Sequence, residues 1–288
     1  MILYVASRMS IVTLATGKAL EDLRILLVSL ESAYSGSYPT VFLYTDEQTA
    51  HKLPAYKGTL HIQKDALNSY TGLNRQQMEK IPGSTYKTKW TDFMCEKINA
   101  MRWAFREADP GQEGIWFLDA DICLFGKLPS LPVGCDLALA PHYIRAGDEA
   151  KYGRFNGGFL WVREPRLLDV WAEATHTSRF YEQAALETVA AAATSLYEFP
   201  IQNNFGWWRL FQSVQSPQQL VPLFGFNRRA EGVGLTFEGA PLLSVHTHFH
   251  EKSDPYTLEF NTFILALLEK LGKHPPAAEL LRTLRRKI

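Results

Sequence analysis

The sequence predicts an α/β fold with a mixed, mainly parallel central sheet flanked by helices. Short apolar runs, which are typical of buried strands, alternate along the chain with longer stretches that carry apolar residues at helical spacing. One run, residues 114–118, is apolar throughout and is followed at once by the acids Asp119 and Asp121. Central parallel strands are buried on both faces, and ligands bind beyond their carboxyl ends. This run therefore predicts both the centre of the sheet and the place of a site.

The composition is that of a globular protein with a sizeable core. The chain has 288 residues, of which 46% are hydrophobic and 21% are charged. No repeat, low-complexity tract or linker divides the sequence, so we expect one domain over residues 1–288 with a helical C-terminal segment at about 256–288. The 30 basic and 30 acidic side chains cancel, which argues against a nucleic-acid partner.

The cysteines and the N-terminal sequence indicate in which cellular compartment the protein is expected. The three cysteines, Cys95, Cys123 and Cys135, are odd in number and lack the spacing of a metal site, so we expect free thiols and a cytoplasmic location. The apolar N-terminal stretch is interrupted by Arg8 and Ser10, which does not fit a signal peptide. No apolar run reaches the length of a membrane span.

The N-terminal part of the chain predicts three strands and two long helices before the central strand. Strands are expected at residues 11–15, 41–44 and 59–62, and helices at residues 18–34 and 90–108. The polar residues 68–84, punctuated by Gly and Pro, predict a loop or lid beside the site.

The remainder of the chain continues the alternation. Further strands are expected at residues 137–140, 158–162 and 242–249, and helices at residues 166–174, 181–194, 256–271 and 277–288. The strand at 242–249 carries His246, His248 and His250 at alternate positions, so all three are expected on one face.

Asp119 and Asp121 are the strongest candidates for a metal site. Their side chains are one residue apart at the end of a buried strand, where two carboxylates can chelate a hard divalent cation. The alternative is a polar strand end whose acids are merely solvated. A pair of acids at this spacing occurs often by chance, so the interpretation depends on other motifs.

Four further motifs follow in sequence order. They are Phe155-Asn156-Gly157-Gly158-Phe159, Tyr181-Glu182-Gln183-Ala184-Ala185-Leu186, Phe199-Pro200 with Asn203-Asn204, and His246 with Lys252 six residues later. Together with the two acids they resemble the GT-A nucleotide-sugar glycosyltransferases. The likeness is nearest to the retaining group that includes glycogenin and the bacterial lipopolysaccharide galactosyltransferases, glycosyltransferase family 8. It covers roughly residues 13–252.

The resemblance implies a Rossmann-like GT-A fold and a set of roles. Asp119, Asp121 and His246 would hold Mn²⁺ or Mg²⁺, which bridges the diphosphate of a UDP-sugar donor, and Lys252 would touch phosphate. Oxygen and imidazole ligands suit such a cation, which stabilises the charge of a leaving diphosphate. The acceptor would be a hydroxyl of a glycan, a lipid-linked sugar or a protein.

Residues around the donor are implied in the same way. Asn156, Glu182 and Gln183 would flank the reacting sugar carbon, and Gly157 would permit close backbone approach. Lys97 resembles the basic residue that contacts donor phosphate. Thr16 ends the first strand where the family contacts the nucleotide, although Gly17 replaces the acid or amide that usually follows.

Simpler interpretations stand beside several of these roles. His248 or His250 is an alternative to His246 as the metal ligand. The alternative for Lys97 is a surface lysine whose aliphatic stem is buried while its charged end is in solvent. Asn156-Gly157 also fits a plain turn, and Glu182 and Gln183 fit the polar first turn of a helix.

Two other functions remain open on the sequence alone. A phosphatase of the haloacid dehalogenase type also uses a hydrophobic strand followed by D-x-D, but Cys123 stands where its motif requires Thr. A non-catalytic glycan-binding relative of the transferase fold is the second. The basic residues 282–287 predict either a solvated helix end or weak peripheral contact with an anionic membrane.

Overall fold

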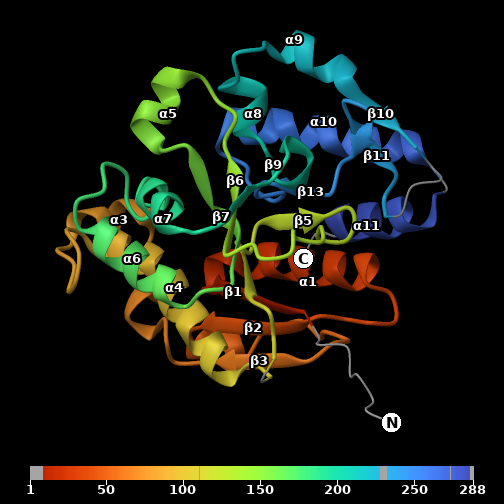
Figure 1. Ribbon diagram of the computed structural model, residues 1–288. Helices are drawn as coiled ribbons and strands as arrows, with labels where there is room; N and C mark the ends of the chain where they lie inside the picture. Colours follow the sequence, from red (N-terminus) through yellow and green to blue (C-terminus); the bar gives the residue numbers. More distant parts are fainter. Residues whose placement is uncertain (1–8, 110, 228–231, 273, 286–288) are drawn as a thin grey trace.

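The computed structural model describes residues 9–109, 111–227, 232–272 and 274–285, and a seven-stranded sheet forms its centre. The strands lie in the order β3-β2-β1-β4-β7-β6-β8 (Figure 1). Their bounds are Ser10–Ala15 (β1), Thr40–Thr45 (β2), Leu60–Gln63 (β3), Ile115–Leu118 (β4), Leu137–Pro141 (β6), Phe155–Val162 (β7) and Leu196–Glu198 (β8).

The sheet is mixed and mainly parallel, as the sequence predicts. Strands β3, β2, β1 and β4 run parallel, whereas β7 runs antiparallel between β4 and β6. The carboxyl ends of β1, β4 and β6 therefore share one edge with the amino end of β7. This edge brings together the chain after Leu118 and the first residues of β7.

Alternate strand residues enter two apolar clusters, one on each face. Ile11 and Trp116 pack with the leucines of α1 (Leu20–Ala33), and the neighbouring Val12 and Phe117 pack with α4 (Lys89–Glu107) and α6 (Arg166–Thr175). Helix α1 lies on the opposite side of the sheet from α4 and α6 (Figure 1). Burial of both strand faces explains why these strands read as continuous apolar runs.

A third apolar cluster lies beside the sheet and holds the C-terminal elements together. It includes a small sheet of order β5-β13-β9, from Ile122–Leu124, Ser244–His246 and Phe205–Gly206. A second small sheet, β10-β11-β12, joins Phe224–Phe226, Leu235–Phe237 and Ala240–Pro241. Helices α10 (Pro255–Leu271) and α11 (Pro275–Arg285) form the expected helical C-terminal segment.

The remaining helices are short. They are α2 (Glu47–Ala50), α3 (Arg75–Lys80), α5 (Ala146–Tyr152), α7 (Leu186–Ala192), α8 (Trp208–Phe211) and α9 (Pro217–Leu220). The segment 68–84 is thus not a plain loop as predicted. Asn74 and Gln77 form a reciprocal capping box at the start of α3, which stabilises a helix in an otherwise polar stretch.

Two other predicted elements are shorter than their sequence patterns. The helix expected at 181–194 begins only at Leu186, and Tyr181 has a φ of 43°, which is incompatible with a right-handed helix. Glu182 and Gln183 therefore precede the helix and are not its first turn. The strand expected at 242–249 ends at His246, so His248 and His250 lie beyond it.

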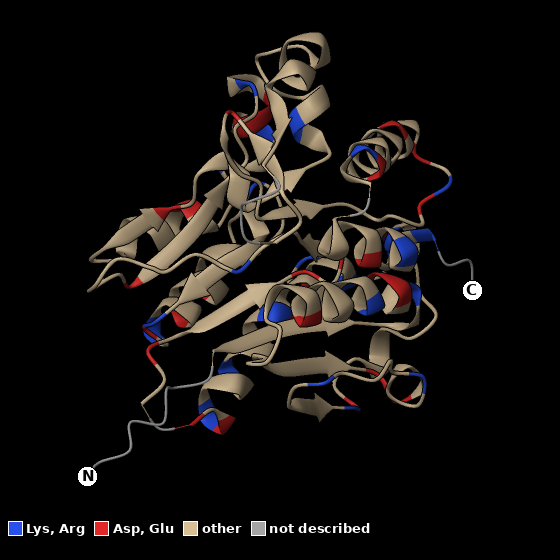
Figure 2. Cartoon of the chain, turned by 90° about the vertical axis from the view of Figure 1, so that its right-hand side faces the viewer, with Lys and Arg blue, Asp and Glu red and all other residues tan. Residues whose placement is uncertain are grey.

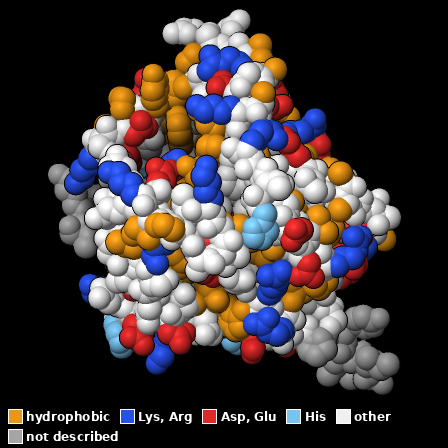
Figure 3. Space-filling model, turned by 90° about the vertical axis from the view of Figure 1, so that its left-hand side faces the viewer, with side chains coloured by type: hydrophobic (Ala, Val, Ile, Leu, Met, Phe, Trp, Pro, Cys, Tyr) orange, Lys and Arg blue, Asp and Glu red, His pale blue; other side chains and the backbone are white. Residues whose placement is uncertain are grey.

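Charged residues are scattered over the described chain. Basic and acidic segments alternate along the ribbon in Figure 2, and both signs are intermixed on the side that carries α3, α4 and α6 (Figure 3). Arg286 and Lys287 of the basic C-terminal segment lie outside the described residues. Among those that are described, no helix has the length and apolar character needed to cross a membrane.

Candidate metal centre

The two predicted acids lie at the carboxyl edge of the central strand. Strand β4 ends at Leu118, and the chain turns through Asp119 and Asp121 into β5. The turn is fixed by backbone hydrogen bonds, since the Asp119 amide donates to the Gly158 carbonyl at 2.8 Å and the Ile122 amide donates to the Asp119 carbonyl at 3.1 Å. Both carboxylates consequently sit beside the start of β7.

His246 reaches this pair through the small sheet. Strand β13 pairs antiparallel with β5, which places His246 opposite Ile122. Its Nε2 lies 3.1 Å from Asp121 Oδ1 and 3.8 Å from Asp119 Oδ2. One ligand atom from each of the three residues lies within 4.8 Å of the others. Two carboxylates and one imidazole form a donor set that suits Mn²⁺ or Mg²⁺ and leaves coordination positions open.

His248 lies next to this cluster but differs from His246. Its Nδ1 is 2.8 Å from Asp22 Oδ2, its Nε2 is 3.5 Å from Asp121 Oδ2, and its side chain is 55% exposed. Among the described residues the three-ligand cluster includes His246 and neither His248 nor His250. Asp22, on α1, was missed by sequence reasoning because nothing in its helical pattern distinguishes it from a surface acid.

The two carboxyl groups have opposite electrostatic environments. Burial raises the pKa of Asp119, and the nearby Lys97 only partly opposes this effect. Burial also acts to raise the pKa of Asp121, but the charges of His246 and His248 outweigh it and hold that pKa well below its usual range. Asp121 is therefore the more firmly ionised acid.

Gly158 is what allows β7 to approach the acids. A Cβ at this position would lie 2.1 Å from Asp119 Oδ2 and 2.6 Å from His246 Cε1. Any side chain there would displace two of the three candidate ligands. The sequence predicts close backbone approach at Gly157, and its neighbour Gly158 is the residue that lies against the acids.

A buried ion pair lies on the other side of Asp119. Lys97 Nζ, on α4, is 2.7 Å from Glu182 Oε1 and 3.8 Å from Asp119 Oδ1, and it donates to the Gly157 carbonyl at 3.2 Å. Burial lowers the pKa of Lys97, but Asp119 and Glu182 outweigh this and raise it. Lys97 is only 1% exposed, so it is not a surface lysine.

Gln183 and Asn156 complete the predicted set at this edge. Gln183 Nε2 donates to the Tyr152 carbonyl at 3.0 Å, and its Oε1 lies 3.5 Å from the Gly157 amide. Asn156 is buried within β7, so the Asn156-Gly157 turn is excluded. Its amide contacts Gly158, His142 and Asn204.

Thr16 and Lys252 are less closely tied to the acids. Thr16 directly follows β1, at the same edge of the sheet, and starts a short 3-10 helix. Lys252 is exposed between β13 and α10, and its backbone amide donates to Glu251 Oε1 at 2.6 Å. Within the described part of the chain, no ion pair or hydrogen bond joins either side chain to Asp119 or Asp121.

Three residues near the cluster, His142, Asn204 and Trp208, were not predicted from the sequence to lie beside the metal ligands. Asn204 Oδ1 lies 3.2 Å from His246 Nδ1, and the Trp208 ring centroid lies 5.1 Å from the His246 ring centroid. The ring of His142 packs in turn against Trp208, with 5.5 Å between the centroids. A usable signal existed for His142, which is a polar residue directly after the strand at Leu137–Pro141.

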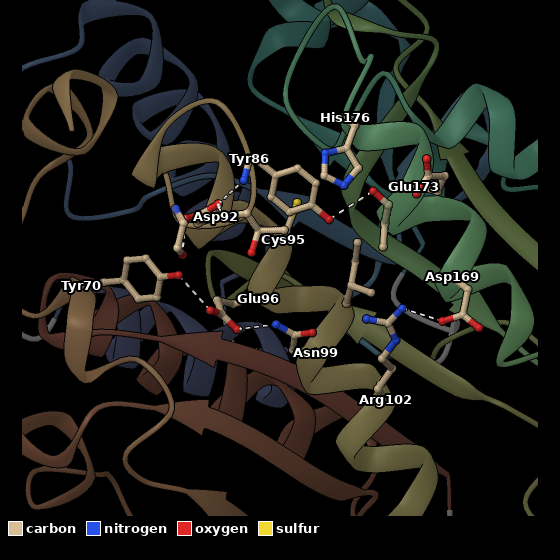
Figure 4. Close-up of a pocket in the computed structure, with 14 residues that line it drawn as sticks. Tyr70, Tyr86, Asp92, Cys95, Glu96, Asn99, Arg102, Asp169, Glu173 and His176 are labelled. Carbon is tan, nitrogen blue, oxygen red and sulfur yellow. Dashed lines mark hydrogen bonds and ion pairs between the residues drawn. The ribbon is translucent and has the colours of Figure 1, made fainter. Parts of the chain in front are cut away.

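A separate polar pocket of about 360 Å³ lies away from the acids (Figure 4). It is bounded by α4, α6 and the segment before α4, and Asp92, Glu96 and Arg102 project into it. Lys97 belongs to the same helix but points toward Glu182 and Gly157. Helix α4 thus separates this pocket from the candidate metal centre.

Solved structures of glycosyltransferases resemble this fold over most of the chain. The galactosyltransferase LgtC, in complex with donor and acceptor sugar analogs, aligns over 97% of this chain and 98% of its own, with a TM-score of 0.53 and 14% identity. The bifunctional glycosyltransferase WbbM covers 98% of this chain and 53% of its own, with a TM-score of 0.53 and 10% identity. Apo GlyE from Streptococcus pneumoniae TIGR4 covers 92% and 64%, with a TM-score of 0.51 and 14% identity.

No family model and no curated protein matches the sequence. At these low identities the likeness concerns the fold, and the site residues depend on the geometry of this chain. The sheet order, the acids after its central strand and the structural neighbours agree with one another: the chain has the GT-A glycosyltransferase fold.

Proposed function

We propose that this chain is a metal-dependent glycosyltransferase that moves a sugar from a UDP-sugar donor to an acceptor hydroxyl, with retention of configuration. One observation carries the proposal. Asp119, Asp121 and His246 converge within 4.8 Å at the carboxyl edge of a GT-A sheet, where ligands of α/β proteins bind. Retention follows from the family resemblance alone.

These three residues would hold Mn²⁺ or Mg²⁺ against the donor diphosphate. When bound, the cation would stabilise the negative charge that builds on the leaving diphosphate. Lys252, on the exposed segment after β13, would add a point charge at the phosphates. Thr16, at the end of β1, would lie at the nucleotide.

The residues on the opposite side of Asp119 would bind the sugar. Lys97 holds one oxygen of Glu182, while Glu182 Oε2 is buried without a hydrogen-bond partner among the described residues. A buried carboxylate oxygen without a partner is costly, and a sugar hydroxyl would satisfy it. Gln183, beside Gly157, would place its amide on the same flank of the sugar, with Asn156 supporting that strand.

The proposal also covers the acceptor of the sugar and the compartment in which the protein acts. The acceptor would be a glycan, a lipid-linked sugar or a protein, reached from the cytoplasm, and Arg282 and Arg285 would allow weak contact with an anionic membrane. The three described cysteines are buried and free, which agrees with a reducing compartment.

The test is thermal unfolding with UDP and a divalent cation. UDP at 100 times its Kd should stabilise the folded protein by about 2.7 kcal/mol, but only when Mn²⁺ or Mg²⁺ is present. Asp121→Ala should abolish this shift, whereas Asp169→Ala, which removes an exposed acid on α6, should retain it. Stabilisation by UDP that is unchanged in EDTA would overturn the metal bridge.

Turnover separates the remaining functions. Slow hydrolysis of a UDP-sugar, screened over several sugars, would identify the donor and exclude a merely glycan-binding relative. Release of phosphate from simple monoesters without any response to UDP would favour the dehalogenase-type phosphatase. The GT-A fold favours the transferase over that alternative.

A further inference from the structure

A chain of buried polar side chains leads to His246 from the backbone of β7. It consists of His142, Asn156, Asn204 and His246, each no more than 6% exposed. Asn204 Nδ2 lies 3.0 Å from Asn156 Oδ1, and Asn204 Oδ1 lies 3.2 Å from His246 Nδ1. Buried polar side chains normally satisfy their hydrogen bonds, so the direction of each bond in this chain can be deduced.

The first constraint comes from the backbone of Gly158. Its amide can only donate, so the Asn156 atom that it contacts at 3.0 Å is the oxygen Oδ1. The NH₂ group of Asn156 must then face His142 Nε2, which lies 3.5 Å away. His142 Nε2 is therefore an acceptor in this arrangement.

The second constraint is independent and comes from Gly153. Its carbonyl oxygen can only accept, so His142 Nδ1, at 2.9 Å, carries the proton. A neutral His142 protonated at Nδ1 has its lone pair on Nε2, as the first constraint also requires. Burial, the largest influence on His142, lowers its pKa to about 4 and keeps the ring neutral at physiological pH. Two backbone groups thus give the same orientation of Asn156.

The orientation of Asn156 determines that of Asn204. Because Asn156 Oδ1 accepts, the Asn204 group that faces it is the donor Nδ2, and Asn204 Oδ1 must face His246. An amide oxygen can only accept, so His246 donates from Nδ1–H. When the ring of His246 is neutral, its lone pair is then on Nε2, the atom that lies 3.1 Å from Asp121 Oδ1.

We propose that Asn156 and Asn204 are positioning residues that hold His246 in its Nδ1–H form and so present Nε2 to a divalent cation. The inference deepens the proposed function and rests on it. A lone pair that faces two carboxylates is favourable only with a positive charge between them, which the cation supplies. Partners of a ligating histidine commonly fix its tautomer and ring orientation in this way.

The direct test is NMR of histidine ¹⁵N nuclei in the cation-free full chain. The His246 ring, assigned with His246→Gln, is observed at alkaline pH. We expect the Nδ1–H tautomer in the wild type and in Asn204→Asp, which retains an acceptor for His246. Asn204→Leu should shift the population toward Nε2–H. An Nε2–H tautomer in the wild type would overturn the proposal, whether or not the variants fold.

Cation affinity provides the second measurement, with the neighbouring asparagine as a matched control. Asn203 is also buried, but its Nδ2 has no hydrogen-bond partner among the described residues. Asn204→Leu should weaken the Kd for Mn²⁺ by about 10- to 100-fold. Asn203→Leu should change it by less than about twofold, since among the described residues no hydrogen bond joins the Asn203 side chain to His246. Equal losses in both variants would contradict the proposal.

The two measurements separate this inference from the proposed function. If the wild type binds neither Mn²⁺ nor Mg²⁺, the proposed function fails, and the tautomer still decides whether the hydrogen-bond chain acts as inferred. If Mn²⁺ binds while Nε2 carries the proton in the cation-free ring, the inference fails and the proposed function stands.

Discussion

Lys97 and Glu182 form a buried ion pair at 2.7 Å, and each side chain is only 1% exposed. One comes from the middle of α4 and the other from the segment before α7, so the pair joins two parts of the chain that bracket Gly157. Removing one partner of a buried pair leaves the other charge without compensation. The Lys97–Glu182 pair therefore contributes both to the structure of the candidate site and to the stability of the fold.

Lys97→Met should destabilise the protein by about 3 to 5 kcal/mol, because Glu182 would remain buried without its partner. Replacing both residues, as Lys97→Met with Glu182→Leu, should cost less than Lys97→Met alone. Arg102→Met is the control on the same helix, since its pair with Asp169 is exposed and should contribute less than about 1 kcal/mol. Urea unfolding measures all three. Equal losses for Lys97→Met and Arg102→Met would contradict the coupling.

Gly158→Ala should disturb the candidate metal centre directly. The added methyl group would lie 2.1 Å from Asp119 Oδ2, so the strand or the ligand must move. We expect a loss of about 1 to 3 kcal/mol in stability from overpacking. Displacement of a ligand should also weaken Mn²⁺ binding by roughly 10-fold or more.

Gly147→Ala is the matched control for this change. Gly147 lies in α5, and a Cβ there would meet nothing within 4 Å. This substitution should stabilise the protein by roughly 0.4 to 1 kcal/mol, because the unfolded chain with Ala has fewer conformations to lose on folding than the chain with Gly. Titration of Mn²⁺ by electron paramagnetic resonance, together with urea unfolding, distinguishes the two variants. Unchanged Mn²⁺ affinity in Gly158→Ala would show that Asp119 is not a ligand.

The central sheet was predictable because strands that are buried on both faces have uninterrupted apolar sequences. Residues 114–118 are apolar without interruption, and β4 is buried throughout. The strand at Phe205–Gly206 gave no such signal, because it is two residues long and is defined by its pairing with β13. The helix α3 was missed since its stability comes from the cap made by Asn74 and Gln77, not from apolar periodicity.

Only those residues of the candidate site that belong to a recognisable sequence motif could be predicted. Asp119 and Asp121 could be placed because they follow a readable strand. The alternation of histidines did not distinguish His246 from His248, since the end of β13 depends on pairing with β5. Asp22 approaches the cluster from α1, and a single sequence contains no record of such a long-range contact.

His142 should make stability depend on pH below neutrality. Burial, the largest influence, lowers its pKa from the ordinary value of 6.5 to about 4 in the folded chain. Between these values the unfolded chain binds a proton that the folded chain does not, so stability falls as the pH falls. His142 should account for a loss of about 2 kcal/mol between about pH 7 and pH 5.

His142→Gln should remove that part of the pH dependence. Urea unfolding in EDTA at the two pH values measures it, and EDTA keeps bound cations from contributing. His51→Gln changes an exposed histidine at the end of α2 and should leave the wild-type slope intact. An identical slope in His142→Gln and the wild type would mean that the ring is not buried in its neutral form.

Asp92 should control the order of the segment that precedes α4. Its carboxylate accepts from the amides of Ser84 at 2.5 Å and Tyr86 at 2.8 Å, and from the Ser84 hydroxyl at 2.9 Å. Burial raises the pKa of Asp92, but these bonds outweigh burial and lower it. Asp92→Asn replaces one accepting oxygen with an NH₂ group that faces N–H donors. The segment should therefore open locally more often.

Hydrogen exchange in the backbone amides of residues 84–86 measures this opening. A loss of about 1.4 kcal/mol would speed their exchange roughly 10-fold, while the amides of the central sheet should stay protected. Asp169→Asn is the control, because Asp169 lines the same pocket from α6 and pairs there with Arg102, which lies outside residues 84–86 (Figure 4). Unchanged exchange in Asp92→Asn would refute the prediction. Faster exchange across the whole sheet would instead show that Asp92 contributes to the global stability of the fold, because local opening leaves the amides of the core protected.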